Sequence, residues 1–307
     1  MVFPGQGSQS VGMLKAYAGL PEVDAVRTEA TAALGADFLK IIDEGPAEQL
    51  NLTVNTQPAM VTAAITAYRA WRALGGAAPA VVAGHSLGEY SALVASGVLL
   101  FKDALPLVKF RAHCMQEAVP EGTGAMAAIL GLDDDAARAA CAEAAQGEVV
   151  QAVNFNAPGQ VVIAGHKAAV ARAIEACKAR GAKRAMPLPV SAPFHSSLLK
   201  PAGEKLKGYL EQVNLIAPQI PVINNVDVNV ESGADRIKDA LVRQASSPVR
   251  WVETVKRMAD EGVTHIVECG PGKVLAGLVK RIDPRVQGFA AADRTSLEAA
   301  LAAVKGA

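Results

Sequence analysis

The feature of this sequence that most restricts its fold is the pentapeptide Gly84-His85-Ser86-Leu87-Gly88, which lies between a predicted strand and a predicted helix. Ala80–Gly84 is a short apolar run, and a helical pattern follows it to about Ala95. So sharp a turn leaves no room for a Cβ at either glycine, and it pushes the serine outward at the end of the strand. The hydroxyl then lies beside the free N–H groups of a helix N-terminus, which can stabilise an oxyanion. We therefore predict that Ser86 is a nucleophile rather than a structural N-cap.

Similar strand–turn–helix units recur on both sides of this motif. Their alternation predicts an α/β fold with a mostly parallel sheet covered by helices on both faces. The 307 residues are 51% hydrophobic and 20% charged, which excludes a disordered chain and suits buried parallel strands. The other predicted elements of this kind are helices at Gln57–Gly75, Lys102–Ala118, Ser197–Val213, Asp235–Ala245 and Val252–Asp260, and strands at Met1–Phe3, Ile220–Asn224 and His265–Glu268.

The pattern changes near Gly122-Thr123-Gly124. The segments that follow predict the order β-α-β-β-α-β, which is typical of a ferredoxin-like α+β unit. We therefore predict a small ferredoxin-like subdomain at residues 123–189, inserted into a large α/β catalytic subdomain made of residues 1–122 and 190–307. The predicted segments of the small unit are strand Ala125–Leu132, helix Asp133–Gln146, strand Val149–Asn154, strand Gln160–Ala164, helix Lys167–Arg180 and strand Arg184–Leu188.

A serine nucleophile needs a base, and position favours His195 among the five histidines. It lies in an irregular segment, Ser191–Ser196, and loop histidines on a rigid scaffold are common general bases. His85 is inside the turn and is expected to point away from the hydroxyl, while the remaining three suit surface or structural roles (His113, His166, His265). No third, acidic member is evident, because Asp133, Asp134 and Asp135 look like charges at a helix N-terminus. A Ser-His dyad oriented by another acceptor, such as a backbone carbonyl, is therefore expected.

Two further features concern substrate recognition. The turn Gly5-Gln6-Gly7-Ser8-Gln9-Ser10 lacks the third glycine and the acidic residue of a dinucleotide site, so it is better suited to directing backbone N–H groups at a reacting carbonyl. Arg111 lies in the middle of a helix with little polar company. Position alone leaves open a salt-bridged surface arginine, but an inward guanidinium would offer a planar fork to a carboxylate.

Composition excludes several other functions. Thirty Lys+Arg balance thirty Asp+Glu, which argues against a general nucleic-acid binder. No apolar stretch is long enough for a membrane span, and the N-terminus lacks the pattern of a secretory signal. The histidines and the four separated cysteines show no metal-ligand spacing, so no metal site is expected. Buried free thiols in a reducing cytoplasm are expected.

The sequence resembles the malonyl-CoA:acyl carrier protein transacylases of bacterial type II fatty acid synthesis. The resemblance covers nearly the whole chain, through motifs in matching order. These are Phe3-Pro4-Gly5-Gln6-Gly7-Ser8-Gln9, Gln57-Pro58-Ala59, Gly84-His85-Ser86-Leu87-Gly88-Glu89-Tyr90, Asn154-Phe155-Asn156 with Pro158-Gly159-Gln160, Asn224-Asn225-Val226 and Gly270-Pro271-Gly272-Lys273-Val274-Leu275. It implies an α/β-hydrolase-like core with the inserted subdomain. One departure is that Met1 almost abuts the first motif, so the first strand is expected to be short, or the start is set late.

The resemblance also implies a role for each site residue. Ser86 is acylated by malonyl-CoA, and His195 takes its proton and returns one to the leaving thiolate. Arg111 pairs with the free carboxylate of malonate. The backbone N–H groups of Gln6 and Leu87 form the oxyanion hole. The backbone carbonyl of Gln244 orients the histidine. The side chain of Phe194 lines the pocket, and a phenylalanine at this position accompanies malonyl specificity in related acyltransferases.

The substrates and partners follow from the same resemblance. Malonyl-CoA is the donor, and the acceptor thiol belongs to the phosphopantetheine of a transient acidic partner, holo acyl carrier protein. No tightly bound cofactor, no nucleic acid and no membrane partner is expected, and the protein is expected to be a cytoplasmic monomer. The absence of flanking linkers favours a free enzyme over an excised synthase module. Two alternatives stay open, a serine esterase or thioesterase on the same dyad and a non-catalytic subunit of a synthase complex.

Overall fold

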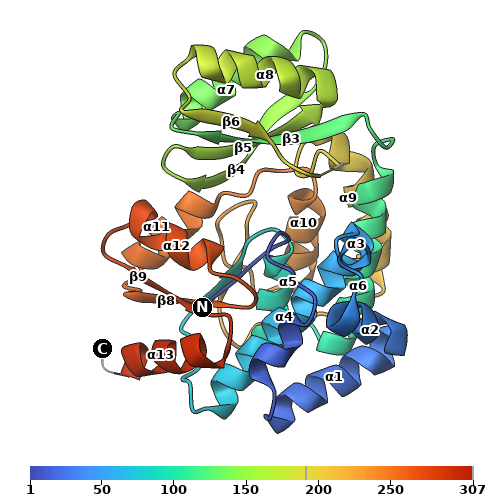
Figure 1. The fold of residues 1–307 in the computed structure, drawn as a ribbon, viewed down its shortest axis with the longest axis vertical. Helices are drawn as coiled ribbons and strands as arrows, with labels where there is room; N and C mark the ends of the chain where they lie inside the picture. Colours follow the sequence, from blue (N-terminus) through green and yellow to red (C-terminus); the bar gives the residue numbers. More distant parts are fainter. Residues whose placement is uncertain (191, 306–307) are drawn as a thin grey trace.

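The larger part of the molecule, which lies below the smaller part in Figure 1, contains a parallel five-stranded sheet. The computed structural model describes residues 1–190 and 192–305, so Ser191 and residues 306–307, which the predicted 190–307 segment includes, lie outside the described residues. The strand order is β7-β2-β1-β8-β9, and every adjacent pair is parallel. The strands are β1 (Val2–Phe3), β2 (Val82–Gly84), β7 (Val222–Ile223), β8 (His265–Cys269) and β9 (Gln287–Ala291).

Alternate residues of this sheet face two separate apolar layers, as expected for strands buried on both sides. Phe3 and Val82 pack into the layer that contains α4 (Thr53–Ala73) and α6 (Phe101–Glu117). Val2 and Ala83 pack into the opposite layer, with α11 (Trp251–Asp260) and α12 (Val274–Ile282). The other helices of the large part are α1 (Pro21–Leu34), α2 (Ala36–Glu44), α3 (Ala47–Leu50), α5 (Gly88–Ala95), α9 (Lys200–Glu211), α10 (Ala234–Gln244) and α13 (Arg294–Lys305), with short 3₁₀ turns at Met13–Tyr17 and Ser197–Leu199.

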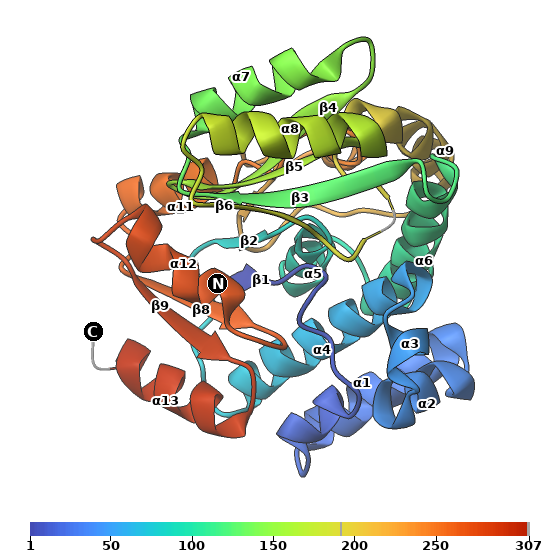
Figure 2. The same cartoon turned by 45° about the horizontal axis from the view of Figure 1, so that its top comes forward.

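The smaller part is an antiparallel four-stranded sheet with two helices on its outer face (Figure 2). Its strand order is β4-β5-β3-β6, which is the ferredoxin-like order for the chain sequence β-α-β-β-α-β. Its apolar core lies between the sheet and the helices. The elements are β3 (Gly124–Leu130), α7 (Asp134–Ala145), β4 (Val150–Ala157), β5 (Gln160–His166), α8 (Lys167–Ala179) and β6 (Arg184–Pro187). This agrees with the predicted fold class, and the boundaries at 123 and 189 stay a prediction.

Backbone hydrogen bonds join the two parts along the outer strand of the small sheet. The amide of Val249 donates to the carbonyl of Val153 at 2.8 Å, and the amide of Phe155 donates to the carbonyl of Val249 at 3.0 Å. The segment that leads into α11 therefore runs beside β4 as a short parallel extension of that sheet. The same segment follows α10, so this junction lies close to the end of the helix that carries Gln244.

The sequence misplaced or missed several elements. The α4 helix begins at Thr53, so Pro58 lies inside it rather than in its first turn. The predicted helix at Ser197–Val213 begins as a 3₁₀ turn and becomes α-helical only at Lys200, one residue before Pro201. Strand β9 was not predicted, because Gln-Gly-Phe-Ala-Ala has little β propensity and the strand lies at the sheet edge. Helices α12 and α13 were not predicted either.

Two further findings concern the whole of the described chain. All four cysteines are buried and unpaired. Among residues 1–190 and 192–305, no helix combines the length and the apolar character needed to cross a bilayer.

Candidate active site

Ser86 lies at the end of β2 in a strained backbone conformation. Its φ angle is 52°, in the left-handed region that non-glycine residues rarely adopt. The turn is tight on both sides, because a Cβ on Gly84 would lie 1.8 Å from the carbonyl carbon of Gly88 and a Cβ on Gly88 would lie 2.1 Å from the carbonyl oxygen of Phe3. The helix α5 starts directly after this turn. The predicted strand–turn–helix geometry is therefore present, with the hydroxyl beside the helix N-terminus.

The structure brings His195 to this hydroxyl from 109 residues away. The Ser86 Oγ lies 2.7 Å from the Nε2 of His195, and the Nδ1 of the ring lies 2.9 Å from the backbone carbonyl oxygen of Gln244. A carbonyl oxygen only accepts, so Nδ1 carries the proton and Nε2 is free to accept from the serine. Burial, followed by the charge of Arg111, lowers the pKa of His195 to about 3. The ring is therefore neutral at physiological pH, as a general base requires.

Arg111 points inward, and its side chain is only 2% exposed. Its two terminal nitrogens donate to the Oε1 of Gln57 at 2.9 Å and to the Oε1 of Gln244 at 3.0 Å, and one also lies 3.3 Å from the Ser86 Oγ. The guanidinium carbon lies 5.3 Å from the ring centre of Tyr90. Within the described residues, no carboxylate forms an ion pair with it. A buried cation held only by neutral groups beside a nucleophile can bind an anionic substrate group.

Buried polar side chains hold the main chain of Ser86 from both sides. The amide of Ser86 donates to the Oδ1 of Asn225 at 2.7 Å, and its carbonyl accepts from the Nε2 of Gln244 at 3.0 Å. Asn225 also donates through Nδ2 to the carbonyl of Gly84 at 2.7 Å. Both side chains are almost fully buried, and Glu89 accepts hydrogen bonds from both of these residues. The position of the nucleophile therefore depends on residues from two distant segments, held by a glutamate of the helix that follows it.

A cavity of about 150 Å³ opens between Ser86 and the small sheet. The amides of Gln6 and Leu87 donate to no protein acceptor in the part of the chain that the structure describes, and Gln6 lines this cavity. Phe194 is among the residues that line this cavity, together with Arg111. A second cavity of about 240 Å³ shares four lining residues with the first, which makes the two adjacent (Gly5, Gln6, His85, Asn154).

His85 lies between these two cavities and joins the two parts of the molecule. Its Nε2 lies 2.7 Å from the Oδ1 of Asn156, on β4 of the small sheet. Its ring therefore turns away from the Ser86 hydroxyl, as the sequence predicts. The remaining histidines lie apart from the dyad. One of them, His166, accepts from the amide of Val149 through Nδ1 at 2.9 Å, which is a structural contact.

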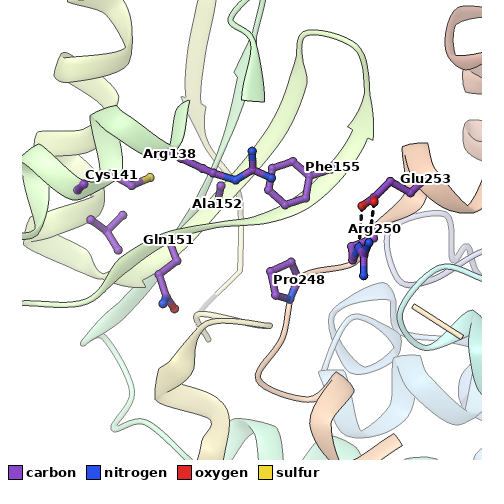
Figure 3. A pocket seen from close by; sticks show the side chains of 10 residues that line it. Arg138, Cys141, Gln151, Ala152, Phe155, Pro248, Arg250 and Glu253 are labelled. Carbon is purple, nitrogen blue, oxygen red and sulfur yellow. Dashed lines mark hydrogen bonds and ion pairs between the residues drawn. The ribbon is translucent and has the colours of Figure 1, made fainter. Parts of the chain in front are cut away.

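A larger hollow of about 400 Å³ lies elsewhere, between α7, β4 and the start of α11 (Figure 3). Its charged groups already have partners. Arg250 forms a paired hydrogen bond with Glu253, and the guanidinium carbon of Arg138 lies 4.4 Å from the ring centre of Phe155. It shares no lining residue with the cavity at Ser86. The polar groups that could perform chemistry therefore converge at Ser86 and not in this hollow.

Sequence reasoning missed three members of the site. Gln57, Glu89 and Asn225 all lie in motifs that the resemblance rests on, but no role was assigned to them. The orientation of Arg111 had a usable signal, because Leu107, Val108 and Met115 place it on the buried stripe of its helix. No cluster of three or more metal-ligating side chains occurs among the described residues.

Comparisons with known proteins agree with this geometry. Residues 1–292 match the family model described as an acyl transferase domain. The chain is 58% identical to the malonyl CoA-acyl carrier protein transacylase of Escherichia coli (strain K12), over 98% of this chain and 97% of that protein. It is 46% identical to the transacylase of the same name from Bacillus subtilis (strain 168), over 99% of this chain and 96% of that protein.

Solved structures show the same likeness. An acyl-carrier-protein S-malonyltransferase from Burkholderia pseudomallei 1710b matches with a TM-score of 0.96 and 64% identity, covering 98% of both chains. A malonyl-transacylase solved in complex with its type II polyketide synthase acyl-carrier protein matches with a TM-score of 0.96 and 53% identity, covering 99% of this chain and 98% of that one. By sequence and by structure, this chain belongs to the acyl transferase family.

Proposed function

We propose that this protein transfers the malonyl group of malonyl-CoA to the phosphopantetheine thiol of holo acyl carrier protein, through a malonyl ester on Ser86. This supplies the extender unit for fatty acid synthesis. The observation that carries the proposal is the buried Arg111, which lies 3.3 Å from the nucleophile and has no carboxylate partner among the described residues. The relatives named above support it, as does the neighbour solved with its acyl-carrier protein.

The first half-reaction acylates the serine. The Oγ of Ser86 attacks the thioester carbonyl while the Nε2 of His195 takes its proton, and the amides of Gln6 and Leu87 stabilise the tetrahedral oxyanion. Collapse of the intermediate breaks the carbon–sulfur bond, and the imidazolium returns a proton to the leaving CoA thiolate. The Gln244 carbonyl keeps the proton of His195 on Nδ1 throughout, in the position that an acid occupies in a triad.

Arg111 has two roles in this step. Its guanidinium pairs with the free carboxylate of the malonyl group and fixes the thioester carbonyl near the Ser86 Oγ. Its positive charge also lowers the pKa of His195. A bound malonyl carboxylate offsets that charge, so the pKa of the imidazole rises and the imidazolium is easier to form. Acetyl-CoA offers no such carboxylate, and both effects favour malonyl. Phe194 lines the same cavity and restricts its size.

The second half-reaction reverses the first with a different thiol. CoA leaves, and the phosphopantetheine arm of the carrier protein enters, so the kinetics are of the ping-pong type. The 240 Å³ cavity beside the site is suited to such an arm, because it opens onto the same residues. The neutral His195 takes the proton of the incoming thiol, and the thiolate attacks the ester. The protein needs no tightly bound cofactor, because the partner carries the phosphopantetheine.

The remaining predictions are also part of the proposal. We expect the protein to act as a monomer in the cytoplasm, where its four unpaired cysteines stay reduced. We expect residues 123–189 to form one subdomain and residues 1–122 with 190–307 the other. Size-exclusion chromatography with light scattering tests the first expectation, and limited proteolysis near the two junctions tests the second.

Acylation of the intact protein tests the function. Radiolabelled malonyl-CoA should leave label on the protein in the absence of carrier protein, and holo carrier protein should then remove that label as malonyl carrier protein. Ser86→Ala should retain its fold and take up no label. The apo carrier protein, which has no thiol arm, is the matched control for the second step.

Three outcomes would contradict the proposal. Label that persists in Ser86→Ala would remove the serine from the mechanism. Label that is released as free malonate, with no dependence on carrier protein, would favour an esterase or thioesterase. A folded protein that takes up no label from malonyl-CoA would favour a non-catalytic subunit.

A further inference from the structure

One buried carboxylate lies directly behind the proposed catalytic residues. Glu89 is in the first turn of α5, three residues after the nucleophile, and its side chain is 2% exposed. Its Oε2 accepts from the backbone amide of Asn225 at 2.9 Å and from the Nε2 of Gln244 at 2.9 Å. These are the same two residues whose side chains hold the amide and the carbonyl of Ser86.

The charge of Glu89 also decides which way the Gln244 amide points. A carboxylate can only accept a hydrogen bond, so it selects the NH₂ end of Gln244. The oxygen end then faces Arg111, which can only donate, at 3.0 Å. Gln244 therefore bridges a buried anion and a buried cation, and its orientation is set from both ends. Its backbone carbonyl receives the Nδ1–H of His195 at the same time.

We propose that Glu89 is a positioning residue for acyl transfer, whose carboxylate holds Gln244 and Asn225 and through them Ser86, His195 and Arg111. It touches neither the substrate nor the reacting atoms. In a Ser-His-Asp triad the acid contacts the histidine directly. Here Glu89 contacts Gln244, and Gln244 contacts the histidine. This inference rests on the roles proposed above for Ser86 and His195.

Glu89 is expected to change its charge within the pH range in which the protein can be assayed. Burial raises the pKa of Glu89 to about 7, against the hydrogen bonds from Asn225 and Gln244. The charged and titratable groups that act on it are Arg111 on α6, Asp227 after β7 and Tyr90 on its own helix. The pKa of His195 is about 3, far below this range. A loss of nucleophile reactivity on acidification through about pH 7 therefore reports Glu89 and not the histidine.

The test is the rate at which a fluorophosphonate probe phosphonylates Ser86, with loss of fluoride, between pH 5.5 and 9. The unsubstituted protein should react more slowly as the pH falls through about 7, because protonated Glu89 no longer selects the NH₂ end of Gln244. Glu89→Gln keeps the shape and removes the charge. It should react about tenfold more slowly at pH 8, a coupling of the size seen within hydrogen-bond networks, and its rate should no longer change near pH 7.

Glu268 provides a matched control. It is a second buried glutamate, on β8, and burial raises its pKa to about 7 as well. It binds the start of α12 instead of the site, since its Oε2 accepts from the amide of Ala276 at 2.8 Å. Glu268→Gln should therefore keep both the rate at pH 8 and the fall below about pH 7. If Glu89→Gln does not fold, Gln244→Met decides, because it breaks the side-chain link between Glu89 and Gln244 while keeping the backbone carbonyl of residue 244 and the link through Asn225. Its fall in rate near pH 7 should be smaller than that of the unsubstituted protein.

The outcomes separate this inference from the proposed function. If Glu89→Gln folds with the rate and pH profile of the unsubstituted protein, or if Gln244→Met keeps an undiminished fall near pH 7, the inference is overturned and the proposed function stands. If Glu268→Gln loses the fall near pH 7 instead, the titrating group is not Glu89. A protein that the probe never labels at Ser86 would overturn both.

Discussion

The two sheets of this molecule are held together in different ways. In the large part, β1, β2 and β7 have only two or three residues each, so few ladder hydrogen bonds fix the loops that follow them. In the small part, β3, β4 and β5 have seven or eight residues each and pair in antiparallel register over almost their whole length. Buried polar side chains hold the strand ends of the first sheet, between its two apolar layers, whereas the second sheet is held by its backbone ladder and one apolar core.

This difference determines what each part tolerates. The polar network of the large part needs particular side chains, because a buried donor or acceptor left without its partner costs about 1–3 kcal/mol. The core of the small part needs only apolar side chains of suitable volume. We therefore expect substitutions in the polar network behind Ser86 to change chemistry, and substitutions in the core of the small part to change stability. Four experiments test this contrast.

The largest effect is expected at the substrate carboxylate. Arg111→Ala should lower the preference for malonyl-CoA over acetyl-CoA by about 100-fold or more, because a buried charge pair that loses one partner costs about 2–5 kcal/mol. Acylation rates with the two labelled donors give the ratio. Arg138, on the small part and exposed, is the matched control, and Arg138→Ala should keep the ratio. If Arg111→Ala leaves the ratio of malonyl to acetyl acylation unchanged, Arg111 does not bind the substrate carboxylate.

A core substitution in the small part should lower the stability of the protein without changing its choice of substrate. Ile163 is fully buried in the middle of β5, and Ile163→Ala should lower the free energy of unfolding by about 3 kcal/mol through lost contacts and a cavity. Urea denaturation measures this, with Ile163→Val as the milder control at about 1 kcal/mol. The malonyl to acetyl ratio of the folded fraction should not change. A changed ratio would show that the two parts are not separable in this way.

A substitution of Asn225 tests whether the polar network behind Ser86 affects the rate of acylation. Asn225→Ala leaves the Ser86 amide and the Gly84 carbonyl without partners, so acylation should slow by about 30-fold, which corresponds to about 2 kcal/mol. Its neighbour Asn224 is also buried, but it binds the amide of Asp227 instead of the nucleophile turn. Asn224→Ala should keep the acylation rate. Equal losses in the two variants would point to a general loss of structure.

The smallest effect is expected in the pH dependence of stability. The folded-state pKa of Glu268 is raised to about 7, above the unfolded value of 4.5, so the folded protein binds a proton that the unfolded chain releases. Stability from this group is therefore present at pH 4.5 and is lost as the pH rises through 7. Glu268→Gln should gain about 1–2 kcal/mol relative to the unsubstituted protein between pH 5 and pH 8. A difference that stays constant with pH would contradict the raised pKa.

The sequence predicted those parts of the molecule that local pattern determines. The turn at Ser86 follows from sterics within five residues, and the antiparallel unit follows from the spacing of its strands and turns. The network behind Ser86 could not be predicted in the same way, because Asn225 and Gln244 lie 136 and 155 residues from Glu89 and meet it only in the folded chain. Strand β9 was missed because its pairing with β8, and not its own propensity, makes it a strand.

The left-handed backbone at Ser86 limits which nucleophiles this fold can carry. A β-branched side chain is disfavoured at a φ of 52°, although Val228 adopts a φ of 54°, so threonine would be strained at this position even though it offers the same hydroxyl. Cysteine has an unbranched side chain of similar shape and fits the same backbone. An acyl-cysteine would be a thioester, the same kind of bond as in donor and acceptor, so each transfer would be close to equilibrium. A change from serine to cysteine therefore adds no backbone strain, whereas a change from serine to threonine adds strain at the nucleophile itself.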